Sequence, residues 1–508
     1  MDAIYQRLVD TNFCIKDGYV PRMNPSYFDD FLSTIENITH QPDVYQFAVF
    51  LAKKFDCENI IDIGCGSGDK LKDISSDFQL LGVDYGDNIQ RIQRFRRNHP
   101  HAICLEHDFG GSELIIQDRE FVKQAVVVCS DVIEHLLNPI PLIVTLRDLL
   151  RDAPIAVVTT PERDLVRGPN HCGPPENLHH VREWSSEEFQ TLFRAAGLNI
   201  EFSGLTANNN RDWAKRTIMT ILSRYGIESK VSAPSDFRVM AFICAYNEED
   251  IIEATLRHLA CQGVDTHLID NWSTDRTVER AEAFLGRGLS RITKFPPDRP
   301  SSTYDWYALL SHVESLSHCS GADWCLHYDA DEIRESPWPQ VRLRDAFFRV
   351  DCQGFNAIDH TCIVFHPTLE QREKPTTLES YRWFEFGKRG GHFQQVKAWK
   401  RQDTKVRLAD SGGHKAEFPG RRIYPFKFLL KHYPVRSQSH GTRKILAERQ
   451  PRWNIEEREK RGWHVQYDGI RSNSSFLRSP SDLLEFDSHS FYCAYLVERL
   501  SGIGATRS

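Results

Sequence analysis

The first half of the chain alternates short apolar runs with helix-like stretches. Four such runs, "NIIDIG", "QLLGVD", "AVVVCSD" and "PIAVVTT", fall between residues 59 and 160. Continuous apolar runs of this length, separated by helical segments, are typical of buried parallel strands joined by crossover helices. The pattern predicts an α/β domain built around a parallel sheet.

This alternation stops and then begins again. A polar "TANNNRDW" precedes the helix-like "AKRTIMTILSRYGI" and the stretch "ESKVSAPSDF", whose Ser, Ala and Pro residues indicate a linker. From Arg238 the order strand, helix, strand, helix returns, which predicts a second α/β domain. The pattern predicts a helical N-terminal extension (1–44) and a first domain (45–204). A linker with a helix (205–236), a second domain (237–475) and a C-terminal tail (476–508) follow.

Composition narrows the class of protein. The 508 residues carry a formal net charge of −7, which argues against a general nucleic-acid binder. The N-terminus has no uninterrupted apolar stretch, and no later run reaches membrane-spanning length, so we expect a cytoplasmic protein without a membrane span. Thirteen cysteines without a C-x-x-C pair suggest reduced core residues rather than a disulfide framework or a zinc site.

The stretch "IIDIGCGSGDKL" places a glycine loop between a buried strand and a helix. Gly64, Gly66 and Gly68 allow a tight turn and leave room for a ligand at the helix N-terminus. Farther on, "LLGVDY" ends a second strand with Asp84, where a carboxylate can accept hydrogen bonds from both ribose hydroxyls. A dinucleotide-binding fingerprint would need a glycine at position 69, where Asp69 stands.

This D-x-G-x-G-x-G passage resembles motif I of class I S-adenosylmethionine (SAM) methyltransferases. The resemblance continues through "HDFGG", "VVVCSDVIEHLLNP", "VVTTPERD" and "LHHVREWSSEEF", and the "D-x-x-E-H" element is similar to that of the ubiquinone-methylase-like branch. It implies a Rossmann-like domain that binds SAM. The residues that it assigns to the cofactor are Asp62, Gly64, Cys65, Gly66, Gly68, Asp84, Tyr85, Asp108, Phe109, Ser130 and Asp131.

Methyl transfer from a sulfonium needs an aligned nucleophile and, for a hydroxyl acceptor, a base. His135, His179 and His180 are the candidate bases in this domain. The alternative for each is a structural histidine that only forms hydrogen bonds.

The second domain opens with "AFICAYNEED", followed by "HLIDNWSTDRT". Asp270 ends a predicted parallel strand, where α/β proteins bind nucleotides. The two stretches together resemble family 2 glycosyltransferases of the GT-A fold, although the usual "D-D-x-S" is here Asp270, Asn271, Trp272 and Ser273. The resemblance implies that the nucleotide sugar contacts Ala245, Tyr246, Asn247, Glu248, Asp270 and Asn271.

The stretch "HYDADEIRE" carries three carboxylates at the end of a predicted strand. It could begin an acidic helix, with Glu332 as a capping residue, or hold a cation. An EF-hand is excluded because Ile333 and Arg334 replace the oxygen ligand and the glycine that it requires. Its place after the two preceding stretches is similar to that of the GT-A D-x-D motif, which implies Mg²⁺ or Mn²⁺ bound by Asp329, Asp331 and His432, with Asp329 also near the donor ribose.

Beyond this motif the predictions rest on residue type. Inverting glycosyl transfer needs a carboxylate base near the acceptor hydroxyl, and Asp359, Glu385 and Asp410 are candidates. In GT-A enzymes basic residues contact the diphosphate, and here Arg436 and Lys444 have that place, the alternative being a solvated basic face.

The two resemblances together imply a bifunctional enzyme, an N-terminal SAM-dependent methyltransferase fused to a C-terminal GT-A glycosyltransferase. The expected partners are a nucleotide-sugar donor and a glycan or lipid-linked glycan acceptor, with peripheral membrane contact at the inner face left open. Two alternatives stay open. In one the first domain only binds SAM or docks the acceptor, and in the other the chain is a non-catalytic component of a polysaccharide assembly.

Overall fold

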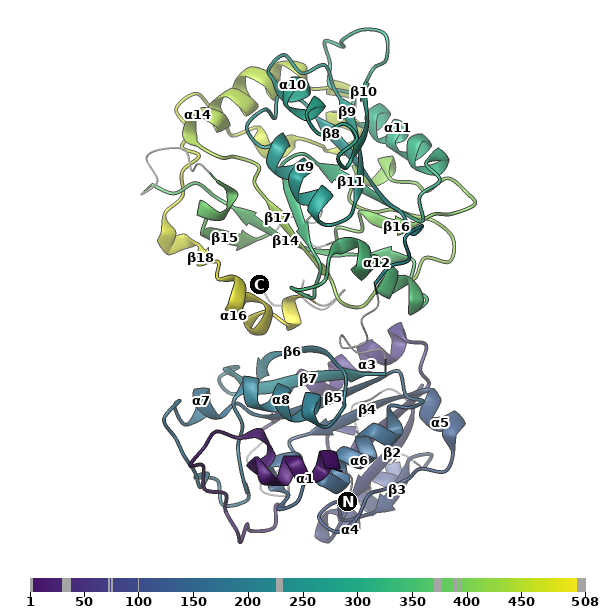
Figure 1. Cartoon of the computed structure of the whole chain (residues 1–508), viewed down its shortest axis with the longest axis vertical. Coiled ribbons are helices and arrows are strands. Elements are labelled where there is room, and N and C mark those ends of the chain that lie inside the picture. The colour runs from purple at the N-terminus through teal and green to yellow at the C-terminus, as the bar shows by residue number, and fades with distance from the viewer. Residues whose placement is uncertain are drawn as a thin grey trace. The chain divides into compact units, whose positions relative to one another are not determined.

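The computed structural model describes residues 3–29, 38–71, 74, 76–98, 100–224, 232–369, 377–387, 392 and 394–499. It divides into two compact units (Figure 1). Unit 1 comprises Met1–Lys230 and Tyr492–Leu496, and unit 2 comprises Val231–Phe491 and Val497–Ser508. The second α/β domain therefore begins inside the segment predicted as a linker.

Unit 1 contains a seven-stranded sheet of order β3-β2-β1-β4-β5-β7-β6. Strands β1 to β5 pair in parallel, and β7 runs antiparallel between β5 and β6. The four predicted apolar runs are confirmed as β1, β2, β4 and β5. The strands are β1 Asn59–Ile63, β2 Gln79–Asp84, β3 Ile103–Glu106, β4 Ala125–Ser130, β5 Ile155–Pro161, β6 Ile200–Ala207 and β7 Lys215–Ser223.

The helix predicted within the linker is wrong. Nine of its residues, Lys215–Ser223, form β7, and the seven from Thr217 to Ser223 are all buried. A strand that is buried on both faces carries no amphipathic pattern by which it could be told from a helix. The β-branched side chains of this segment favour a strand, and they are Thr217, Ile218, Thr220 and Ile221. Residues 225–231 of the predicted linker lie outside the described residues.

The helices of unit 1 flank this sheet. Helix α8 begins with a capping box, in which Ser185 and Glu188 each bind the other's backbone N–H. The α-helices are α1 Ala3–Asp10, α3 Val44–Lys54, α4 Asp87–Asn98, α5 Arg119–Lys123, α6 Ile140–Leu149, α7 Arg163–Val166 and α8 Ser186–Ala195, with short 3₁₀ turns at Asn12–Cys14 and Ile133–His135.

The N-terminal extension belongs to unit 1 rather than standing apart from it. Only α1 is α-helical among the residues described before Val44. Leu8, Phe13 and Tyr19 join the core of the sheet domain, because their side chains are buried together with strand and helix residues. The predicted extension between residues 30 and 37 lies outside the described residues.

Unit 2 contains two sheets. The larger has the order β10-β9-β8-β11-β16-β13, with β8 to β11 parallel, and the smaller has the order β12-β17-β14-β15-β18. The strands are β8 Val239–Ala245, β9 Asp265–Asp270, β10 Leu289–Lys294, β11 Trp324–Asp329, β12 Glu332–Glu335, β13 Ala357–Ile358, β14 His360–Phe365, β15 Trp383–Phe386, β16 Ala398–Lys400, β17 Phe428–His432 and β18 Leu484–Glu485.

The predicted order strand, helix, strand, helix from Arg238 is confirmed as β8, α9, β9 and α10. Glu332, expected at a helix start, instead begins strand β12. The α-helices are α9 Ile252–Cys261, α10 Thr277–Glu282, α11 Trp306–Cys319, α12 Leu343–Cys352, α14 Gln438–Gly441, α15 Ile455–Arg461 and α16 Ser488–Ala494, with a π-helix at Thr442–Arg449. The short 3₁₀ turns lie at Leu378–Ser380, Ala409–Ser411, Gln450–Arg452, Val465–Tyr467, Pro480–Asp482 and Val497–Arg499.

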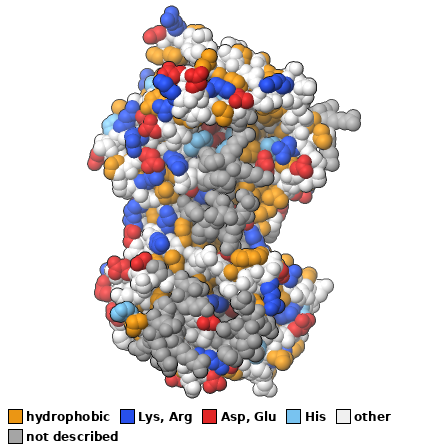
Figure 2. All heavy atoms as spheres, turned by 180° about the vertical axis from the view of Figure 1, so that it is seen from behind, with side chains coloured by type: hydrophobic (Ala, Val, Ile, Leu, Met, Phe, Trp, Pro, Cys, Tyr) orange, Lys and Arg blue, Asp and Glu red, His pale blue; other side chains and the backbone are white. Residues whose placement is uncertain are grey.

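The surface shows no dominance of one charge on the face drawn in Figure 2, where basic and acidic side chains are interspersed. Among the described helices, none is long and apolar enough to cross a bilayer.

Candidate functional sites

The glycine loop of unit 1 follows β1 and turns with left-handed backbone. Gly64, Gly66 and Gly68 have φ angles of 76°, 58° and 81°. A side chain at Gly64 could not be accommodated, because its Cβ would lie 2.2 Å from Cγ2 of Val132. Gly66 donates its N–H to Asp84 Oδ2 at 2.8 Å, which ties the loop to the end of β2.

The carboxylate of Asp84 is held by two backbone N–H groups and one side-chain amide. Its Oδ1 accepts from the N–H of Tyr85 at 2.8 Å and from Asn88 Nδ2 at 3.3 Å. A fixed carboxylate beside a glycine loop suits the ribose of a nucleoside, because each oxygen can accept more than one hydrogen bond. Asp62 accepts from the Tyr45 hydroxyl at 2.9 Å, and burial raises the pKa of Asp62 to about 7.

The other predicted cofactor residues lie after β3 and β4. Phe109 is buried, and Asp108 accepts from the N–H of Gly110 at 2.8 Å. Asp131 has a left-handed φ of 55° and accepts from Thr159 Oγ1 at 2.9 Å, while Ser130 pairs with the same hydroxyl at 3.1 Å. Since β1, β2 and β4 are neighbouring parallel strands, their carboxyl ends bring these residues to one edge of the sheet.

Gln41 is a residue of this site that the sequence did not reveal. Its Nε2 donates to Asp131 Oδ2, and its Oε1 accepts from Lys70 at 3.2 Å. Gln41 stands in the predicted extension, and nothing in "THQPDVY" distinguishes it from a surface glutamine. Buried Cys65 also lies in this region, and burial raises the pKa of its thiol well above the usual range.

Two of the three candidate histidines pack against each other. The ring centroids of His135 and His180 are 4.9 Å apart. His180 donates from Nδ1 to Glu183 at 2.7 Å and accepts at Nε2 from Asn177 at 2.9 Å, so both of its nitrogens are engaged. His135 donates from Nδ1 to the carbonyl of His179 at 3.0 Å, and burial lowers the pKa of His135 to about 3.

His179 is less enclosed than these two. It contacts the Ser26 carbonyl through Nδ1 at 3.2 Å. Beside His135, burial followed by the charge of Asp131 raises the pKa of Glu134 well above its usual range. Glu134, His135 and His180 have ligand atoms within 4.8 Å of one another, a set able to hold a metal ion. The sequence motif contained Glu134, but its burial could not be known in advance.

The carboxyl ends of β8, β9 and β11 form the second candidate site. Ala245 pairs with Asp270, and Cys244 pairs with Asp329, so the predicted donor and metal residues lie at one edge of the sheet. Asp270 is buried and accepts from the N–H of Ser273 at 3.2 Å. Burial raises the pKa of Asp270 above its usual value.

Tyr246 and Asn271 are joined by a residue that the sequence did not single out. The guanidinium of Arg452 lies 4.1 Å from the centroid of the Tyr246 ring and donates to Asn271 Oδ1 at 2.7 Å. Asn247 has a left-handed φ of 54° and binds Thr274 and Glu448 through its side chain. The predicted donor-binding residues therefore share one hydrogen-bonded region.

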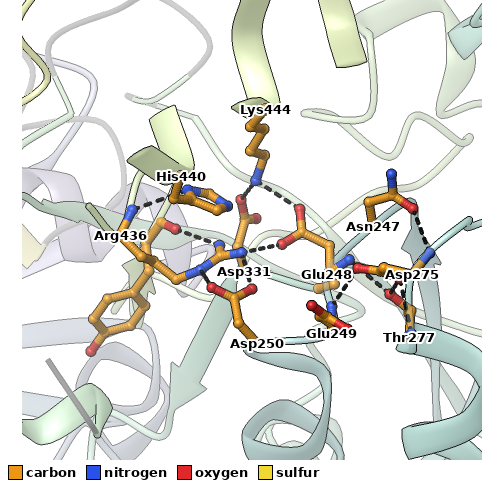
Figure 3. Close-up of polar contacts among 12 residues, drawn as sticks. Asn247, Glu248, Glu249, Asp250, Asp275, Thr277, Asp331, Arg436, His440 and Lys444 are labelled. Atoms are coloured by element: carbon orange, nitrogen blue, oxygen red, sulfur yellow. Dashed lines mark hydrogen bonds and ion pairs between the residues drawn. The ribbon is translucent and has the colours of Figure 1, made fainter. Parts of the chain in front are cut away.

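An ion-pair network connects this edge with the C-terminal part of unit 2 (Figure 3). Lys444 Nζ lies 2.7 Å from Glu248 Oε1 and 2.8 Å from Asp331 Oδ2. Arg436 donates to Glu248 and to Asp250, each at 2.6 Å. The predicted pair Arg436 and Lys444 thus lies against the predicted acidic residues rather than on a solvated basic face.

Asp331 and His432 come together, whereas Asp329 has a different cationic partner. His432 Nε2 is 3.5 Å from Asp331 Oδ1. Burial alone would raise the pKa of Asp331, but Lys444 and His432 hold it well below the usual range. Burial alone would lower the pKa of His432, but Asp331 raises it to about 10. Asp329 binds Lys397 at 2.8 Å, and Lys397 also binds Glu332 at 2.7 Å.

The three candidate bases for glycosyl transfer differ in how far their carboxylates are exposed to solvent. Asp359 is buried, and its Oδ1 accepts from the N–H groups of His360 and Gln395 at 2.8 and 2.7 Å. Glu385 accepts from His366 at 3.0 Å with a quarter of its side chain exposed. Asp410 is exposed and contacts the Tyr307 hydroxyl at 3.4 Å. Glu385 and Asp410 are reached by solvent, and Asp359 is enclosed.

Comparisons with known proteins concern unit 1. Residues 42–201 match the model of a family described as a methyltransferase domain. No curated protein matches the chain. The methyltransferase domain of bacterial CtHen1-C is 20% identical over 36% of this chain and 97% of its own, with a TM-score of 0.28.

Two further solved structures are similar to a comparable share of the chain. A SAM-dependent methyltransferase from Clostridium acetobutylicum is 11% identical over 38% of this chain and 95% of its own, with a TM-score of 0.30. A SAM-dependent methyltransferase from Aquifex aeolicus is 12% identical over 39% of this chain and 98% of its own, with a TM-score of 0.28.

The family match and the geometry of the glycine loop define the class of the first domain. Residues 42–201 form a class I SAM-dependent methyltransferase domain, and the activity of this domain is methyl transfer from SAM. The match ends at residue 201, so the function of unit 2 depends on its own residues.

Proposed function

We propose that the chain is a bifunctional enzyme of glycan synthesis. Unit 2 transfers a sugar from a nucleotide-sugar donor to a glycan or glycolipid, and unit 1 methylates a hydroxyl of the same or a related glycan. The observation that carries the proposal is the convergence of Glu248, Asp270 and Asp331 at the carboxyl ends of parallel strands, with Lys444 and Arg436 beside them. α/β proteins bind nucleotides at such an edge.

Sugar transfer needs only the nucleotide sugar and the acceptor, and methyl transfer needs only SAM and the acceptor. In unit 2 the acceptor oxygen bonds to the anomeric carbon of the donor, the bond from that carbon to the phosphate oxygen breaks, and its electron pair leaves with the nucleoside diphosphate. In unit 1 the acceptor oxygen bonds to the methyl carbon, and the electron pair of the broken bond stays on sulfur. In both steps the acceptor hydroxyl loses its proton to a base, for which Glu385 or Asp410 in unit 2 and His135, His179 or His180 in unit 1 are candidates.

The SAM site fits its proposed ligand. The left-handed glycine loop, the fixed Asp84 and buried Phe109 supply a tight turn, a ribose acceptor and an apolar surface. Asp62 and Asp131, at the ends of neighbouring strands, complete the set. When bound, SAM supplies an activated methyl group, and the protein orients it and the acceptor.

The residues expected to bind Mg²⁺ or Mn²⁺ fit their ligand less well than the residues of the SAM site do, because of the contacts that Asp329 and Asp331 make. Each of these carboxylates already binds a lysine ammonium group. Glycosyl transfer still requires positive charge near the departing diphosphate, because negative charge grows there as the bond breaks. We place the enzyme in the cytoplasm, because SAM and nucleotide sugars are found there. It contacts the inner membrane face peripherally when the acceptor is lipid-linked.

The proposal is tested by ligand-induced stabilisation of the full chain. We expect SAM to raise the melting temperature, and one of UDP, GDP, CMP or dTDP to raise it independently, because a ligand that binds the native state stabilises it. Asp84→Asn should weaken only the SAM effect, and Asp270→Asn only the nucleotide effect. Stabilisation by SAM without any nucleotide effect would reduce unit 2 to an assembly or docking role.

A further inference from the structure

Lys444 occupies the place between the two carboxylates at which a bridging cation would act. Its Nζ lies 2.7 Å from Glu248 and 2.8 Å from Asp331, which follow β8 and β11 (Figure 3). All three side chains are at most 7% exposed. Lys444 therefore forms a buried, doubly charge-assisted contact rather than a surface ion pair.

The predicted ligand set for a divalent cation is neutralised by protein cations. Asp331 binds Lys444 and His432, and Asp329 binds Lys397. Among the described residues of unit 2, the one set of three residues with ligand atoms close enough for a metal is Glu248, Asp250 and His440, and Arg436 donates to both of its carboxylates.

A divalent ion would have to displace Lys444 or Lys397 from these carboxylates. Since both lysine side chains are at least nine-tenths buried, the displaced ammonium would lose its partner inside the protein. An unpaired buried charge is strongly unfavourable, whereas the existing pairs are compensated. The residues present therefore do not fit the metal that the sequence pattern predicts.

We propose that Lys444 supplies the positive charge that a divalent cation would otherwise bring to the leaving diphosphate, so that sugar transfer in unit 2 is metal-independent. This inference rests on the proposed function of unit 2. An ammonium group has three N–H donors, and two of them bind Glu248 and Asp331. The third can donate to a phosphate oxygen as the electron pair of the broken bond passes to it.

The backbone around Lys444 is an independent sign of a specialised site. Lys444 stands in a π-helix, Thr442–Arg449, and π-helical turns are rare and occur frequently at functional sites. The two carboxylates fix the ammonium from the side of the sheet, which preorganises it for a charge that develops during the reaction.

The first test measures binding of the stabilising nucleoside diphosphate to the full chain by calorimetry, in EDTA and in Mn²⁺. We expect the Kd in the two conditions to agree within about threefold. Lys444→Met should raise the Kd about tenfold or more, and Lys444→Arg should restore most of the loss because it keeps the charge. Lys431→Met is the matched control, since Lys431 pairs with Glu335 at 2.6 Å outside this network.

Binding that requires Mn²⁺ and is lost in Asp331→Asn would overturn the inference and leave the proposed function standing. Absence of binding by any nucleoside diphosphate in either condition would overturn both. A second measurement covers the case in which Lys444→Met fails to fold. Mn²⁺ titration followed by electron paramagnetic resonance should give the same stoichiometry for the unaltered protein and Asp331→Asn, and a bound equivalent that this change removes would refute metal independence.

Discussion

Gly64 is the residue on which the shape of the SAM loop depends most directly. Its φ of 76° is unfavourable for any residue with a Cβ, and Val132 fills the space that a Cβ would need. The functional residues of unit 1 are therefore constrained through backbone conformation as well as through side chains. In unit 2 the constraints are electrostatic, because Asp329 and Asp331 are placed by Lys397 and Lys444.

Gly64→Ala should abolish measurable SAM binding and destabilise unit 1. Gly197→Ala is the matched control, because Gly197 has a φ of 70° but no atom within 4 Å of its Cβ position. The control should cost about 1–2 kcal/mol from backbone strain alone. Gly64→Ala should cost about 1–3 kcal/mol more from the steric clash. Equal losses of stability and unchanged SAM affinity, measured by denaturant unfolding and calorimetry, would show that the loop tolerates a side chain.

His135 should stay neutral throughout the physiological range. Burial lowers its pKa in the folded protein to about 3, while an unfolded histidine titrates near pH 6.5. On acidification the unfolded state takes up this proton first, so folding stability falls by about 1.4 kcal/mol per pH unit from this group between those two values. The NMR signals of the imidazole ring should show no titration between pH 5 and 8, and a midpoint near 6.5 would contradict the burial of His135.

Strand β7 shows which elements could be predicted from sequence and which could not. The runs that became β1, β2, β4, β5 and β8 were recognisable because each is a short, continuous apolar segment. The run "KRTIMTILS" mixes threonines with apolar residues, and only pairing with β5 and β6 explains its burial. Lys397 and Arg452 were missed for a similar reason, since their partners come from segments far away in the sequence.

The amides of β7 should be strongly protected from hydrogen exchange. Because β7 is paired on both sides, its N–H groups should exchange only on opening of the unit 1 sheet, as slowly as those of β5. Mass spectrometry of peptides covering residues 215–223 and 155–161 measures this directly. Exchange of the β7 peptide at the rate of an exposed segment would mean that residues 215–223 form a linker after all.

The chain as a whole joins two compact units and returns to the first near its C-terminus. Residues Tyr492–Leu496 belong to unit 1, where Lys215 donates to the carbonyl of Ala494 at 2.8 Å. Buried Leu496 lies close to Gly204 of β6, since a Cβ at Gly204 would be 2.8 Å from Leu496 Cβ. Five residues of the predicted tail, Tyr492–Leu496, are therefore a structural part of unit 1, which no local pattern in their sequence indicates.

Leu496→Ala should destabilise unit 1 by about 2–5 kcal/mol, because it removes a buried side chain from that unit. In calorimetric melting the transition that SAM raises should move to lower temperature, and the transition that the nucleotide raises should stay in place. Leu484→Ala is the control, since Leu484 is 41% exposed in unit 2. A shift confined to the nucleotide-dependent transition would assign the segment to unit 2 instead.

The most direct test of a glycosyl-transfer activity in unit 2 is the release of nucleoside diphosphate from a panel of nucleotide sugars. We predict slow hydrolysis of one donor by the full protein. The hydrolysis rate should fall about 100-fold in Asp331→Asn, because this change disrupts the charge network at the leaving group. The rate should be unchanged in Asp403→Asn, whose side chain is exposed. Hydrolysis that is unchanged in Asp331→Asn, or absent for every donor, would contradict a glycosyl-transfer site in unit 2.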